Sequence, residues 1–96
     1  MAKFELGELI STKGVVRRIW AQKGFGAHVM RSLKRYTRCD WGEMDDEDKR
    51  MNDTAVGPNE DSVLAVYEHP KHPEWKIVIN TEADRSVTTI HFPHEH

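Results

Sequence analysis

The chain has 96 residues, with 14 lysines and arginines against 16 aspartates and glutamates, and its formal net charge is −2. This length suits one small domain with a modest core, so we expect residues 1–96 to form a single domain whose function lies on its surface. The only cysteine, Cys39, excludes an internal disulfide and a cysteine-rich metal site. An apolar run of membrane-spanning length and the apolar core of a secretory signal are both lacking, so we expect a cytoplasmic protein without a membrane partner.

Helices are predicted in the first half of the chain. A first helix is expected from about residue 12 to 22, because apolar residues recur there at helical spacing after Ser11 and Thr12, two candidate N-caps. After Gly24 a second apolar face follows, formed by Phe25, Val29, Leu33 and Tyr36. This second helix is amphipathic, and its opposite face is a basic stripe made of Arg31, Lys34, Arg35 and Arg38.

A third helix is predicted to begin at the acidic run Asp45, Asp46, Glu47 and Asp48. Carboxylates near the first turn accept hydrogen bonds from unpaired amides and favour the positive end of the helix dipole. Met44, Met51 and Ala55 could form its inward face, and Gly57-Pro58-Asn59 would end it.

The composition then changes to residues typical of β-strands. Three strands are predicted at Val63–Tyr67, Trp75–Ile79 and Val87–Phe92, joined by two links that suit hairpins. We therefore expect an α+β fold in which two or three N-terminal helices pack on one face of a C-terminal three-stranded antiparallel β-meander. Trp41 and Trp75 could belong to the core or anchor an interface.

The charges are segregated along the chain. No acidic residue occurs from Leu9 to Cys39, whereas acidic residues dominate from Asp40 to Asp61. Such a division indicates a polyanionic partner, a basic partner, or neutralisation of one half by the other. The basic stripe could contact phosphate groups of nucleic acid, and the cluster Asp45 to Asp48 could contact a basic groove. Each run could equally be a solvated or structural helix face.

Five histidines form a candidate metal site. In a meander the first hairpin and the end of the third strand lie at the same sheet edge, which brings together His69, His72, His91, His94 and His96. Imidazole nitrogens in this number could bind zinc or a similar ion. The alternative is that these histidines are turn and tail residues and that the protein has no cofactor. No spacing predicts catalysis, and Glu82, Asp84 and Arg85 are expected to stabilise the second hairpin.

Several segments resemble a family of small uncharacterised proteins carried by plasmids, integrative elements and prophages of gut bacteria. The resemblance lies in Asp40-Trp41-Gly42, Glu47-Asp48, Asn52, Phe92-Pro93 and, most specifically, the stretch from Thr81 to Thr89, TEADRSVTT. Members often carry labels such as plasmid-related protein or type I restriction subunit M. The basic stripe and the final His94-Glu95-His96 depart from that family's pattern.

The resemblance implies a role in contests between a mobile element and its host. We therefore expect a non-enzymatic inhibitor that binds a host defence nuclease or CRISPR effector protein, of the anti-CRISPR or anti-restriction type. The contact would be formed by Arg31, Lys34, Arg35 and Arg38 or by Asp45, Asp46, Glu47 and Asp48. The alternatives are a direct nucleic-acid-binding protein and a small metal-stabilised binding module.

Overall fold

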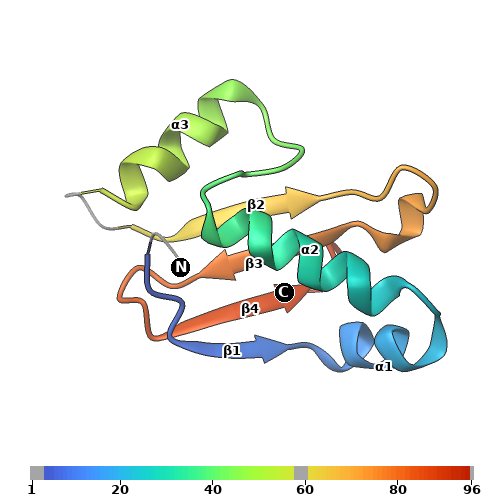
Figure 1. The fold of residues 1–96 in the computed structure, drawn as a ribbon. Coiled ribbons are helices and arrows are strands. Elements are labelled where there is room, and N and C mark those ends of the chain that lie inside the picture. The colour runs from blue at the N-terminus through green and yellow to red at the C-terminus, as the bar shows by residue number, and fades with distance from the viewer. Residues whose placement is uncertain (1–3, 58–60, 96) are drawn as a thin grey trace.

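The computed structural model describes residues 4–57 and 61–95, in which helices precede most of the sheet (Figure 1). In chain order the elements are β1 (Glu8–Ser11), α1 (Lys13–Ala21), α2 (Phe25–Thr37), α3 (Asp46–Ala55), β2 (Val63–Tyr67), a 3₁₀ turn η1 (Pro73–Trp75), β3 (Ile77–Thr81) and β4 (Val87–His91). The predicted α+β class is confirmed by these elements. The strands form one mixed sheet in the order β1-β4-β3-β2.

The predicted meander is present, but the sheet has a fourth strand. β2 pairs antiparallel with β3, and β3 pairs antiparallel with β4, with Val78 opposite His91 and Thr81 opposite Thr88. β1 adds to the free edge of β4 in parallel orientation. The prediction of a purely antiparallel, three-stranded sheet was therefore wrong in strand number and in orientation.

The missed strand is short and its pairing is remote in sequence. β1 has four residues, and its two central residues, Leu9 and Ile10, are both apolar, so no alternation of apolar and polar residues indicates a strand. Its partner, β4, begins 76 positions after Ser11. A pairing of this kind depends on the assembled meander and leaves no local signal.

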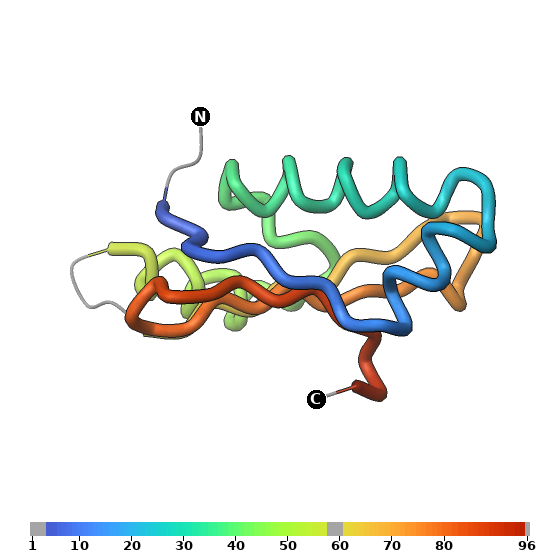
Figure 2. The backbone as a smooth tube through the Cα atoms, turned by 90° about the horizontal axis from the view of Figure 1, so that it is seen from below, coloured from blue at the N-terminus to red at the C-terminus, as the bar shows by residue number. Residues whose placement is uncertain are grey.

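Helix α2 and the sheet form two layers, and α1 lies at the end of the sheet (Figure 1). Figure 2 shows α2 lying over one face of the sheet, while α3 lies beside β2. Side chains alternate along the strands, so that Ile77, Ile79 and Ile90 face the helices and are at most 2% exposed. The opposite face of the sheet carries no helix among the described residues.

Each of the three α-helices begins at a residue whose local chemistry favours a helix start. Thr12 caps α1 by accepting a hydrogen bond from the Val15 amide at 3.3 Å, and Asp45 caps α3 by accepting one from Asp48 at 2.8 Å. Gly24, with φ of 92°, makes the left-handed turn between α1 and α2. Within residues 4–57 and 61–95, none of the helices has the length and apolar character needed to cross a bilayer.

Both candidate tryptophans belong to the core. Trp41 is 3% exposed and Trp75 is 5% exposed. Trp75 precedes β3, which begins at Ile77 and not at Trp75 as predicted, because Pro73–Trp75 forms the 3₁₀ turn. The core is completed by Val15, Phe25, Val29, Tyr36, Ala55, Val63, Ala65, Tyr67, Ile77, Ile79, Ile90 and Phe92.

Candidate nucleic-acid interface

The outer face of α2 carries the basic stripe predicted from the sequence. The helix buries Phe25, Val29 and Tyr36 against the sheet, and helical periodicity turns Arg31, Lys34 and Arg38 to solvent. In the part of the chain that the structure describes, none of these three cations forms an ion pair. With a rise of about 1.5 Å per residue they extend over about 10 Å of helix.

Arg35, the fourth predicted member of the stripe, is held within the molecule. Its Nε donates to Asp40 at 2.8 Å, its Nη2 donates to the other carboxylate oxygen at 3.1 Å, and Glu43 lies 3.8 Å away. The guanidinium also lies 5.2 Å from the ring centre of Tyr67. The hydrogen bond between Arg35 and Asp40 lowers the pKa of the Asp40 carboxyl group and raises the pKa of the Arg35 guanidinium group. This pair fixes the end of α2 against the following loop.

Most of the neighbouring acidic groups also have structural roles. Asp45 caps α3, Asp40 pairs with Arg35, and Asp53 accepts a hydrogen bond from the indole of Trp41 at 2.9 Å. The remaining carboxylates of the predicted cluster are exposed in the first turn of α3, where they favour the helix dipole: Asp46, Glu47 and Asp48. Among the described residues these three carboxylates form no ion pair. Among the described residues, ion pairs between the two charged halves are therefore limited to those of Arg35 with Asp40 and Glu43.

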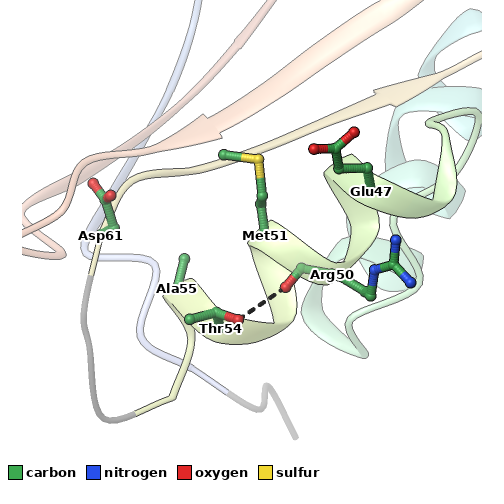
Figure 3. Close-up of a pocket in the computed structure, with 6 residues that line it drawn as sticks. All are labelled: Glu47, Arg50, Met51, Thr54, Ala55 and Asp61. Atoms are coloured by element: carbon green, nitrogen blue, oxygen red, sulfur yellow. Dashed lines mark hydrogen bonds between the residues drawn. The ribbon is translucent and has the colours of Figure 1, made fainter.

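A shallow hollow lies on the outer side of α3. Figure 3 shows Glu47 and Arg50 at one end and Asp61 at the other, with Met51 between them. The hydrogen bond drawn there, from the Thr54 hydroxyl to the Arg50 carbonyl at 3.1 Å, is internal to the helix. Pro58 and Asn59 of the predicted helix stop lie outside the described part of the chain.

Four of the five predicted metal-ligating histidines lie in the described part of the chain, and these four do not gather at one place. His69 and His72 lie together, with ring centres 5.1 Å apart, and His72 stacks on Trp75 at 3.9 Å. His94 instead stacks on Phe92, and His96 lies outside the described residues. His91 alternates with the core residue Ile90 and so faces the other side of the sheet. Across residues 4–57 and 61–95, no group of three or more metal-ligating side chains is arranged to hold an ion.

The ring of His69 also lies close to His28, which was not among the predicted metal ligands. His28 of α2 is 3% exposed, its ring centre lies 5.3 Å from that of His69, and its Nε2 donates to the Trp75 carbonyl at 2.9 Å. Burial, assisted by the nearby His69 and Arg31, lowers the pKa of His28. The sequence did contain a signal that His28 is buried, because the residue lies one turn before Ser32 on the buried face of α2. The imidazole therefore serves as a neutral core group linking α2 to η1.

Comparison of the chain with protein-family models, with curated proteins and with solved structures gave no match. The resemblance based on TEADRSVTT thus stays a prediction.

Proposed function

We propose that this protein is a non-enzymatic binding protein that uses the outer face of α2 to contact the phosphate backbone of nucleic acid. The observation that supports this proposal is the exposure of Arg31, Lys34 and Arg38 in consecutive turns with no ion-pair partner among the described residues. Lysine and arginine contacts to phosphate give affinity and orientation without reading sequence. Binding should therefore be largely independent of base sequence.

The test is the salt dependence of binding to duplex DNA and to RNA of unrelated sequences. Each phosphate contact on duplex DNA contributes about −0.9 to the slope of log K against log salt concentration. The triple variant Arg31→Glu, Lys34→Glu, Arg38→Glu should bind far more weakly, and any residual binding should have a slope shallower by about 2.7. Arg35 is left unchanged, because its loss would release Asp40 and disturb the fold.

A matched control separates this face from net charge alone. Lys13→Glu, Arg50→Glu and Lys76→Glu change the net charge by the same amount at exposed positions away from the outer face of α2. The control variant should retain most of the affinity. An equal loss of affinity in both triple variants would show non-specific electrostatic attraction. The proposal would be refuted if the wild-type protein bound neither DNA nor RNA at low salt.

A second candidate function is inhibition of a nucleic-acid-targeting nuclease. It is favoured by the three exposed carboxylates of the first turn of α3, Asp46, Glu47 and Asp48, which could occupy a basic groove in place of phosphates. The purified protein would then lower the activity of restriction nucleases or CRISPR effectors, and the variant Asp46→Asn, Glu47→Gln, Asp48→Asn would not. Inhibition that instead disappears in the α2 variant would assign the effect to competition for nucleic acid.

A further inference from the structure

The two edges of the sheet differ in whether their outward backbone groups are already hydrogen-bonded. At the β2 edge, the side-chain amide of Asn52 donates to the Leu64 carbonyl at 2.7 Å and its oxygen accepts from the Leu64 amide at 3.3 Å. Further along, the Glu43 amide donates to the Val66 carbonyl at 2.9 Å. The groups that another strand would need are thus already bonded. This edge is closed to strand addition.

The β1 edge has no such cover. The Glu8 amide donates to Ser86 and the Thr12 amide to Ile90, so the even-numbered residues of β1 face β4. The amides and carbonyls of Leu9 and Ser11 consequently point away from the sheet, and no described residue bonds to them. Figure 2 looks onto this edge and shows no segment in front of β1. β1 also lacks proline and lysine, which usually protect an exposed edge.

Apolar side chains flank this open edge on both faces. Leu9, on the helix face, is 48% exposed, and Ile10, on the opposite face, is 43% exposed. The helix that follows β1 adds further exposed apolar side chains: Val16, Ile19 and Trp20, the last 86% exposed. An unpaired backbone edge with apolar flanks favours strand addition from another chain.

We propose that β1 pairs in antiparallel orientation with β1 of a second copy of this chain, joining two sheets into one continuous sheet. If Ile10 faces Ile10 of the second copy, Leu9 lies opposite Ser11 of that copy, and the outward amides and carbonyls of both residues form hydrogen bonds. Exposed Glu8 then lies across from Thr12 of the second copy. The neighbouring Lys13 of that copy is positively charged and complements the negative charge of Glu8. This charge complementarity favours a second copy in this register.

The pairing has a geometric consequence. Its two-fold axis stands perpendicular to the sheet, because facing residues of the two strands point to the same side. Both copies of α2 therefore lie on one face of the joined sheet. The inference does not depend on the nucleic-acid-binding function, since the β1 edge contains none of the cations assigned to it.

Sedimentation equilibrium of the full chain tests the pairing. The wild-type protein should show a concentration-dependent mass approaching twice the 11.1 kDa of the chain. Ile10→Lys, and independently Leu9→Pro, which removes an outward amide, should shift the mass to that of the monomer while circular dichroism shows a retained fold. The matched control Leu64→Lys alters an apolar residue of similar exposure at the closed edge and should remain dimeric.

Disulfide trapping tests the register. In a Cys39→Ser background, Ile10→Cys should form a cross-linked dimer under mild oxidation, since facing Cα atoms about 4.5 Å apart lie within disulfide range. Glu8→Cys should not cross-link, because in this register the two Glu8 positions are more than about 10 Å apart. A monomeric wild-type protein, or dimers that persist in both Ile10→Lys and Leu9→Pro, would overturn the proposal. Cross-linking at Glu8 but not at Ile10 would overturn this register.

Discussion

Replacing Tyr36 with alanine is expected to lower the free energy of unfolding by about 3–5 kcal/mol, the range typical of removing a large buried aromatic side chain. Tyr36 is fully buried, and its ring packs edge-on against Phe4 at 5.3 Å and Trp41 at 5.7 Å. Its loss leaves a cavity between α2 and the sheet, which neighbouring rings can fill only in part. Urea unfolding followed by circular dichroism measures the change.

The Tyr36 hydroxyl contributes a separate part of this effect. The Tyr36 hydroxyl donates to the Val63 carbonyl at 3.2 Å, and the Thr88 hydroxyl donates to the Leu6 carbonyl at 2.7 Å. The Thr81 hydroxyl lies between them and is hydrogen-bonded to Tyr36 at 2.6 Å and to Thr88 at 2.7 Å. Burial raises the pKa of Tyr36 to about 12, which keeps this donor protonated at neutral pH. Tyr36→Phe removes this hydroxyl group but keeps the ring.

The phenylalanine variant therefore serves as the control for packing. It should cost about 1–2 kcal/mol, because one buried oxygen loses a partner while the cavity stays filled. Equal losses in Tyr36→Phe and Tyr36→Ala would mean that hydrogen bonding, and not packing, accounts for the stability. A loss below about 1 kcal/mol in Tyr36→Ala would contradict the predicted role of the ring altogether.

Replacing Arg85 with glycine is expected to lower the free energy of unfolding by about 2–3 kcal/mol, in the range of lost hydrogen bonds from a charged donor. Its Nη2 donates to the Ala55 carbonyl and its Nη1 to the Asp61 carbonyl, both at 2.7 Å. Ala55 is the last residue of α3, whose carbonyl end carries partial negative charge. The guanidinium thus joins three segments: α3, the residues just before β2, and the β3–β4 hairpin. Thermal and urea unfolding measure the loss.

Two further substitutions at Arg85 separate the causes. Arg85→Lys keeps the charge but loses the planar fork, so it should cost nearly as much as Arg85→Gly. Arg85→Ala should be worse than Arg85→Gly by about 1 kcal/mol, because the residue has a φ of 61°, where a Cβ is strained. Wild-type stability in Arg85→Lys would show that the bidentate contacts are not what stabilises this junction.

The contacts of Asp84 and Arg85 give a structural reason for the residue types in the TEADRS segment. Asp84 and Arg85 were predicted to stabilise the hairpin, and Asp84 does so by accepting a hydrogen bond from the Ser86 amide at 2.9 Å. Hydrogen bonds from the Ser86 side chain and from its backbone amide lower the pKa of Asp84. Arg85 contacts the Glu82 and Ala83 carbonyls of its own turn and extends beyond it to α3. A segment with this many backbone contacts needs no catalytic or binding role to account for its composition.

The candidate interface could be predicted in part. Periodicity placed Arg31, Lys34 and Arg38 on the outer face of α2, and the structure agrees, because an amphipathic helix exposes whatever lies opposite its buried face. Periodicity could not reveal that Arg35 pairs with Asp40, since that contact depends on the turn after the helix. The same limit applies to His28 and His69, which meet only when α2 packs beside η1.

By itself the sequence determined what depends on neighbours in the chain: three helices, the caps of α1 and α3, three strands and the charge division between α2 and α3. These features follow from side-chain periodicity and from local hydrogen bonds, which act over a few residues. Only the tertiary structure decided that β1 joins β4, that Asn52 closes one sheet edge while the other stays open, and which charges remain unpaired. Each of these results depends on contacts between residues far apart in the chain, which exist only after the helices have packed on the sheet.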